Sequence, residues 1–225
     1  ILNKMNIKYF SNITNNVYSR YINSLKRKYD IKNQLKILDE LVYYHPYAPK
    51  DYSSKEEILK TIMDCIINQR EMKCRYESLL SKNTDNPIIL KPYCIVIHQD
   101  ALYLLAEDKD NNIKTYSIDR FKSVNMMSKG FHRHPNFKPS MHLNNYIGII
   151  GDGERCKFEI IFRNDPVLHR VLRERNWFRN PSFELLPDGC LKMTFTSCKS
   201  IELERWISSW GKDIIKVVEI EGNKT

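Results

Sequence analysis

The sequence predicts an α+β protein in which helices come first and the strands form two separate sheets. Three observations support this fold class. Apolar residues recur at helical spacing in the first fifty residues. Short segments of residues 70–124 alternate between apolar and polar side chains and are separated by turn-forming residues. Beyond a connection that contains two prolines, strand and helix patterns then alternate as far as residue 220.

Residues 1–50 predict two amphipathic helices. Val17 and Leu25 share a face of the first helix, and Asp30 is placed to cap the second. Residues 44–49 contain two prolines, which prevent the helix from continuing and indicate a linker. We interpret residues 1–50 as a helical coupling segment.

A third helix and about five short strands are expected next, in a domain that spans residues 51–130. Ser54 and Glu57 have the spacing of a capping box at the start of that helix. Turn-rich breaks separate the strands, which are expected at residues 72–76, 88–97, 101–106, 113–118 and 121–124. Short strands at this spacing favour a small, strongly bent sheet or a barrel.

Residues 131–155 read as a linker, and residues 156–225 as a second domain. A strand at 158–162 precedes a helix that Asp165 and Pro166 open. Two strands, joined at Asp188-Gly189, and a helix ending near Gly211 follow, and residues 214–220 form the last strand. The order β-α-β-β-α-β predicts a ferredoxin-like layer.

Composition indicates a globular protein with 42% hydrophobic and 28% charged residues among 225. No apolar stretch is long enough to span a bilayer and no signal peptide is evident, so we expect a cytoplasmic protein without a membrane partner. The net charge of +9 is concentrated in residues 1–50, where nine Lys and Arg face three Asp and Glu. This excess suggests an anionic partner such as nucleic acid.

The sequence predicts neither an enzyme nor a metal or cofactor site. It contains no Gly-rich phosphate loop, no Gly-x-Ser-x-Gly motif and no His-Glu-x-x-His motif. His132 and His134 form the one local histidine pair, which needs distant residues to complete a metal site. The cysteines lack Cys-x-x-Cys spacing and are expected to be reduced core thiols: Cys65, Cys74, Cys94, Cys156, Cys190 and Cys198.

An ordered series of motifs resembles the WYL domain of bacterial transcriptional regulators. The series comprises Tyr76, then Pro92-Tyr-Cys-Ile95, Leu102-Tyr-Leu104 and Lys114-Thr-Tyr-Ser-Ile-Asp-Arg-Phe121. Trp206-Ile-Ser-Ser-Trp-Gly211 and the strand after it resemble the end of the C-terminal extension that usually accompanies this domain. Leu102 replaces the family's Trp, and Lys114 and Ser117 replace arginines, so the pocket has fewer guanidinium groups than is usual.

The resemblance implies a small Sm-like β-barrel that binds an anionic or nucleic-acid-derived ligand, and a homodimer formed through the C-terminal domain. It also implies a DNA-binding winged helix upstream, which residues 1–50 do not show; because the sequence begins with Ile1, we expect a fragment. The chain is then the effector-sensing and dimerisation region of a regulator. The alternative is an accessory protein whose barrel binds single-stranded nucleic acid directly.

The resemblance and the strand pattern select six ligand-binding candidates: Tyr76, His98, Tyr103, Lys114, Tyr116 and Arg120. Each has an alternative role: the tyrosines in core packing, His98 as an exposed turn residue, and Arg120 as a surface arginine or a partner of Asp119. A planar guanidinium suits an anion such as phosphate, so we favour binding for Arg120. If the strand is regular, Lys114, Tyr116 and Arg120 share one face and Ser117 lies on the other.

Four arginines follow the first strand of the C-terminal domain: Arg170, Arg173, Arg175 and Arg179. They either contact nucleic acid or solvate the outer face of a helix, and the solvated face is favoured.

Overall fold

The computed structural model describes residues 48–78, 86–143, 147–149 and 154–220. The chain forms two compact units that divide between Arg133 and His134, and each is described by itself. The two helices predicted within residues 1–50 lie outside the described residues.

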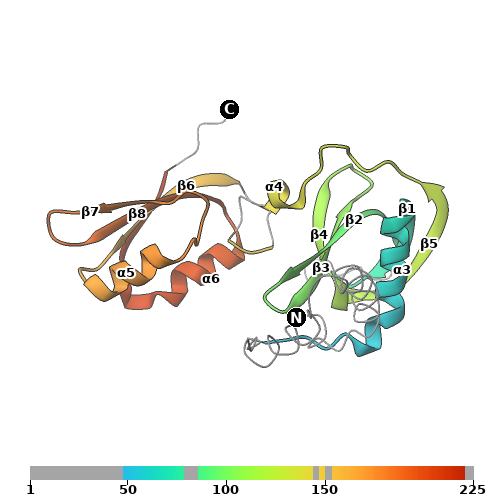
Figure 1. Ribbon diagram of the computed structural model, residues 1–225, viewed down its shortest axis with the longest axis horizontal. Helices are drawn as coiled ribbons and strands as arrows, with labels where there is room; N and C mark the ends of the chain where they lie inside the picture. Colours follow the sequence, from blue (N-terminus) through green and yellow to red (C-terminus); the bar gives the residue numbers. More distant parts are fainter. Residues whose placement is uncertain (1–47, 79–85, 144–146, 150–153, 221–225) are drawn as a thin grey trace, which may run out of the picture. The chain divides into compact units, whose positions relative to one another are not determined.

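The described part of the first unit contains a helix followed by a five-stranded antiparallel sheet, as the sequence predicts (Figure 1). The strand order is β4-β3-β2-β1-β5, and α3 packs against β5, β1 and β2. In chain order the elements are η2 (Ser53–Lys55), α3 (Glu56–Ile67), β1 (Arg70–Tyr76), β2 (Ile88–His98), β3 (Ala101–Glu107), β4 (Ile113–Ser117), η3 (Ile118–Arg120) and β5 (Phe121–Gly130).

The connection between β4 and β5 forces this sheet to bend. These two strands form opposite edges of the sheet, and in a flat sheet four strand spacings place the edges roughly 19 Å apart. Only the three residues of η3 join them, and a 3₁₀ turn of that length rises about 6 Å. The sheet must therefore curl so that its edges approach each other at η3.

The capping box predicted for α3 is wrong. The helix begins at Glu56, its N-cap position is Lys55, and no side chain caps it. Ser54 instead lies within the 3₁₀ turn η2, which the hydrogen bond from Lys55 N to Tyr52 O closes (2.9 Å). Because this tight turn precedes the helix, Ser54 lies before the position from which its hydroxyl could bond the helix amides.

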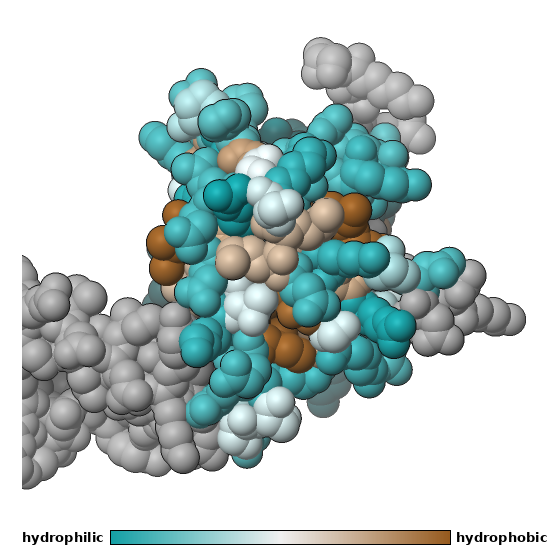
Figure 2. Space-filling view, turned by 90° about the vertical axis from the view of Figure 1, so that its right-hand side faces the viewer, coloured by the Kyte–Doolittle hydropathy of each residue, from teal (hydrophilic) through white to brown (hydrophobic). Residues whose placement is uncertain are grey.

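β5 is longer than predicted, since it continues from Phe121 to Gly130 and pairs along β1 as far as Arg70. Its second half is largely exposed and contains two adjacent methionines, Met126 and Met127, so it shows no alternation that a sequence pattern can detect. Figure 2 faces the side of the unit on which Figure 1 labels β5, and it shows a mainly hydrophilic surface with apolar atoms near its centre. Lysine and other polar side chains along an edge strand disfavour pairing with another chain.

Alternating residues of β3 supply much of the core of the first unit. Leu102, Leu104 and Ala106 are fully buried and point to the same side of the sheet. They pack with Met72 and with Tyr52 from the segment before α3. Burial of these side chains fixes which face of β3 points inward, and therefore the faces of its neighbours.

The second unit is a four-stranded antiparallel sheet with the strand order β7-β8-β6-β9. Figure 1 shows α5 and α6 along one face of this sheet. The predicted order of strands and helices is observed: β6 (Arg155–Phe162), α5 (Pro166–Glu174), β7 (Ser182–Leu185), β8 (Leu191–Cys198), α6 (Ile201–Ser209), η4 (Gly211–Asp213) and β9 (Ile214–Ile220). Before β6, the described residues of this unit also include a short helix, α4 (Pro139–Leu143).

Three local signals in this unit act as predicted. Asp165 caps α5, because its carboxylate accepts hydrogen bonds from the amides of Val167 (2.9 Å) and Leu168 (3.2 Å). Gly189 has a φ of +82° in the turn between β7 and β8, and Gly211 has a φ of +50° just after α6. Glycine adopts these conformations without the steric cost that a side chain adds.

Aromatic rings dominate the core between the helices and the second sheet. Phe178 stacks on Phe195 with ring centroids 3.6 Å apart. Trp177, Trp206 and Trp210 contact one another at 5.7–5.8 Å. The two tryptophans of the Trp-x-x-x-Trp-Gly motif therefore pack in this core.

Candidate ligand-binding site

The turn η3 is attached to the end of β1 by two hydrogen bonds. The amide of Ser117 donates to the hydroxyl of Tyr76 (3.0 Å), and the amide of Glu77 donates to the carbonyl of Arg120 (3.0 Å). These bonds join the end of the edge strand β4 to the end of β1, the neighbour of the opposite edge strand β5. We call Lys50, Tyr76, Ser117, Asp119 and Arg120 the η3 corner.

Tyr76 connects the η3 corner to the core. Its ring contacts Tyr116 edge-on at 5.2 Å and Phe121 at 4.9 Å. Burial raises the pKa of the Tyr76 hydroxyl, against the opposing effects of the Ser117 amide and the Arg120 guanidinium, which also hydrogen-bonds it. Tyr76 is therefore held neutral, with its hydroxyl directed toward η3.

Asp119 is already paired with other groups of the corner. Its carboxylate accepts hydrogen bonds from Lys50 Nζ (2.8 Å) and Ser117 Oγ (2.7 Å). Burial acts to raise the pKa of Asp119, but these two donors outweigh it and lower the pKa below its usual value. The alternative in which Arg120 is a partner of Asp119 therefore has no support in this geometry.

The other carboxylate close to Arg120 is also paired. Glu77 forms an ion pair with Lys122 at 2.6 Å. Within the described part of the chain, no ion pair to a carboxylate is found for Arg120. Its positive charge stands beside the Tyr76 hydroxyl with both neighbouring carboxylates neutralised by lysines, an arrangement that suits an external anion.

His98 and Tyr103 lie together near the turn between β2 and β3, with ring centroids 6.4 Å apart. The Nε2 atom of His98 is buried and has no hydrogen-bond partner among the described residues. Tyr103 pairs with Val96 on one side and with Ser117 on the other. The second of these pairings places Tyr103 across from the residue that leads into η3.

Residues 57–126 match the sequence model of the WYL domain. The chain contains a WYL domain. Among solved structures, the proteasome accessory factor B/C (PafBC) of Arthrobacter aurescens matches with 15% sequence identity and a TM-score of 0.39. That match covers 78% of this chain but 26% of PafBC, so the chain spans about a quarter of the length of this protein. A comparison with curated proteins gave no match.

The register of the WYL domain separates two of the predicted tyrosines. Tyr103 is opposite Ser117, whereas Tyr116 is opposite Leu104, which lies on the core face. Successive residues of a strand point to opposite faces, so Tyr103 and Tyr116 lie on different faces of the sheet. Tyr116 is 9% exposed and belongs to the core cluster.

The expectation that one strand face carries Lys114, Tyr116 and Arg120 is wrong. β4 ends at Ser117, and Arg120 lies in the 3₁₀ turn η3. Strand alternation therefore ends before Arg120. Lys114 is exposed while Tyr116 is buried, because Lys114 extends toward the turn between β3 and β4.

Lys114 belongs to a polar network that holds that turn. It forms an ion pair with Asp108 at 2.7 Å, and Asp108 also accepts from the amides of Asp110 and Asn112. Burial opposes the ionisation of Asp108, but these donors lower its pKa below the usual value. The role of Lys114 in this structure is to stabilise the turn between β3 and β4, and Lys114 is not part of the η3 corner.

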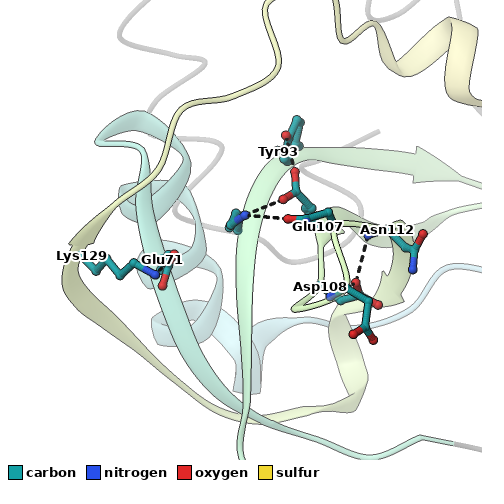
Figure 3. A network of polar contacts seen from close by, with 9 residues as sticks. Glu71, Tyr93, Glu107, Asp108, Asn112 and Lys129 are labelled. Carbon is teal, nitrogen blue, oxygen red and sulfur yellow. Dashed lines mark hydrogen bonds and ion pairs between the residues drawn. The ribbon is translucent and has the colours of Figure 1, made fainter.

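Figure 3 shows that the network continues along β2 and β3. Tyr93 donates to Glu107 (2.7 Å), and Lys91 forms an ion pair with the same carboxylate (2.5 Å). Glu71, which is buried, pairs with Lys129 of β5 at 3.0 Å. These contacts join β2 to β3 and β1 to β5, and they stabilise the sheet.

The structure thus brings Tyr76, Tyr116 and Arg120 together, places His98 beside Tyr103, and directs Lys114 elsewhere. Sequence reasoning missed Lys50, which approaches Asp119 from 69 residues away. Ser117 and Asp119 both lie in the motif Ser117-Ile-Asp-Arg120. Their two-residue spacing was a sequence signal for the hydrogen bond between the Ser117 hydroxyl and the Asp119 carboxylate.

In residues 48–78, 86–143, 147–149 and 154–220, no three His, Cys, Asp or Glu side chains gather as a metal site would require. Nor does any helix of those segments have the length and apolarity to cross a membrane. All six cysteines are unpaired; five are buried, as expected for core thiols, whereas Cys94 is only half-buried. Burial raises the pKa of Cys65 to about 11 and that of Cys74 to about 12.

Proposed function

We propose that this chain is the ligand-sensing region of a WYL-type transcriptional regulator, and that the η3 corner of its WYL domain binds an anionic or nucleic-acid-derived ligand. One observation carries the proposal. Arg120 lies beside the Tyr76 hydroxyl, while Asp119 and Glu77 are already paired with Lys50 and Lys122. A guanidinium that forms no ion pair with the described carboxylates is suited to bind an external anion.

The neighbouring side chains suit the same ligand. The Tyr76 hydroxyl is a fixed polar group beside the guanidinium. Tyr103 offers a flat ring across from Ser117, and the buried Nε2 of His98 is a hydrogen-bonding group that a ligand would satisfy. In this proposal the sheet acts as an Sm-like barrel, and binding, without any chemical reaction, is the function of the site.

Regulation would follow from differential affinity. A ligand shifts DNA binding only if it binds one arrangement of the protein better than another. The proposed arrangement is a cytoplasmic homodimer held by a ferredoxin-like second unit, and duplex DNA would bind through a winged helix outside the chain described here. Light scattering of this chain tests the homodimer, because a monomer at tens of micromolar, as an order-of-magnitude range, contradicts it.

The binding test uses Arg120→Ala, with Lys60→Ala as a matched control that removes one exposed positive charge of α3, away from the η3 corner. The probes are a fluorescein-labelled oligothymidylate, followed by anisotropy, and unlabelled nucleoside monophosphates as competitors. Loss of a charge-assisted contact is worth roughly 1.5–3 kcal/mol, so Arg120→Ala should bind about 10- to 150-fold more weakly. Lys60→Ala should bind nearly as wild type does.

A third variant tests the ordering of contributions. Tyr103→Phe should lose only about 0.5–1.5 kcal/mol if its hydroxyl makes one neutral hydrogen bond. Equal binding by wild type and by folded Arg120→Ala contradicts the proposal. A steep salt dependence of oligothymidylate binding would assign the site to single-stranded nucleic acid as a polymer. Conversion of the nucleotides during incubation would show that the chain is an enzyme.

A further inference from the structure

A hollow of about 550 Å³ lies in the second unit, between α5 and the turn that joins β7 to β8. Its size falls within the usual range of about 300–1,000 Å³ for small-molecule sites. We call it the hairpin hollow. Its lining consists of Asn164, Pro166, His169, Arg170, Arg173, Glu174, Leu185 and Gly189.

A specific contact joins the two walls of the hairpin hollow. The Asn164 side-chain amide donates to the carbonyl of Asp188 (3.3 Å) in the turn between β7 and β8. Gly189 packs so closely on Asn164 that a Cβ at this position would collide with the amide. The turn is therefore held against the start of α5, and the two walls of the hollow are fixed relative to each other.

Two arginines of α5 line the hollow one helical turn apart. Residues at positions i and i+3 of a helix have Cβ atoms about 5–6 Å apart, so Arg170 and Arg173 can bind the same anion. The Arg173 guanidinium lies over the ring of Phe183 at 5.9 Å. This stacking uses the face of the guanidinium and leaves its N–H edge available for hydrogen bonds.

Nearby carboxylates do not neutralise these arginines. Across the described residues, no ion pair involving Arg170 or Arg173 is found, whereas Asp165 and Asp213 both pair with Arg163. Asp165 also caps α5, and His169 donates from Nε2 to the carbonyl of Arg163 (2.9 Å). Other polar groups around the start of the helix are therefore occupied.

The remaining lining residues limit the ligand. Glu174 is the one carboxylate of the lining, so the charged side chains there carry two positive charges against one negative. This balance suits one anionic group better than a long polyanion. Leu185, which is 62% exposed, and Pro166 add apolar surface on which a ring or hydrocarbon part would rest.

We propose that the hairpin hollow binds a small phosphomonoester, with its phosphate on Arg170 and Arg173 and its apolar part against Leu185 and Pro166. This site is separate from the η3 corner and does not depend on it, because all its residues belong to the second unit. In this proposal Arg170 and Arg173 bind a ligand, which is the alternative to the solvated-face role that the sequence favours for them.

Calorimetric titration of the full chain tests this proposal with adenosine 5′-monophosphate as the probe and adenosine as its uncharged counterpart. The monophosphate should bind saturably and adenosine should not. In an Arg120→Ala background, which removes binding at the η3 corner, Arg170→Ala and Arg173→Ala should each weaken binding roughly tenfold or more, and the double variant should abolish it. Arg179→Ala, which removes an exposed arginine outside the lining, is the matched control and should bind as wild type does.

Arg120→Ala separates this proposal from that for the WYL domain, because it should leave binding at the hairpin hollow intact. Unchanged melting temperatures should show that the arginine variants fold. The proposal is overturned if the monophosphate does not bind, if adenosine binds equally well, or if the double variant binds like wild type. It is also overturned if an oligothymidylate binds more tightly than the monophosphate through the same two arginines, which would indicate a nucleic-acid surface.

Discussion

Removing the hydroxyl of Tyr52 should destabilise the WYL domain. Tyr52 is fully buried, and its hydroxyl accepts a hydrogen bond from the amide of Leu102 at 2.7 Å. Phenylalanine at position 52 keeps the ring but leaves that amide buried without this partner. The cost of an unsatisfied buried donor is about 1–3 kcal/mol. In a domain of 60–100 residues each kcal/mol lowers the melting temperature by about 4–8 °C.

Thermal unfolding followed by circular dichroism measures this effect. Tyr116→Phe is the matched control, because Tyr116 is also buried in this core and no hydrogen bond to its hydroxyl is found among the described residues. The control should melt close to wild type, and Tyr52→Phe should melt at least several degrees lower. Equal melting temperatures for Tyr52→Phe and wild type would refute the reasoning that this hydrogen bond holds β3 to the segment before α3.

Three further predictions concern stability. Asp119→Asn should destabilise the protein at neutral pH by no more than about 1 kcal/mol, because the pair with Lys50 is partly exposed. Since the folded pKa of Asp119 is lowered, this stabilisation is present above the unfolded pKa near ~4 and is lost as pH falls through the folded pKa. The denaturant curves of wild type and variant should therefore converge in acid. Gly189→Ala should cost at least about 1 kcal/mol and more than Gly211→Ala in the same urea titration, because both positions have positive φ but only the first adds a collision. Asp165→Ala should cost about 0.5–2 kcal/mol through loss of the α5 cap, and a wild-type urea midpoint would contradict this.

Features that depend on neighbouring residues were predictable from the sequence. The Asp165 cap, the turn at Gly189 and the end of α6 at Gly211 each follow from a few consecutive residues. The capping box at Ser54 has the same kind of pattern, but the 3₁₀ turn η2 displaced it. The full length of β5 was not predictable, because its outer half is ordered by pairing with β1 and has no apolar alternation of its own.

The candidate site was predictable only in part, because it depends on strand register and strand ends. The family resemblance selected Tyr76 and Arg120, which the curled sheet brings together. Strand alternation placed Lys114 with Arg120, but the strand ends before Arg120 and Lys114 pairs with Asp108. The contact of Lys50 with Asp119 joins residues far apart in sequence and had no local signal.

The location of a bound anion tests the central claim most directly. Oligothymidylate should be titrated into the ¹⁵N-labelled chain while backbone amide and arginine Nε resonances are followed by NMR. We predict that the largest chemical-shift changes occur at the Arg120 side chain, at the amides of η3 and at Tyr103, and that Arg120→Ala removes them. Shifts confined to residues of the second unit, or no shifts at saturating probe, would contradict the assignment of the η3 corner as the ligand site of this WYL domain.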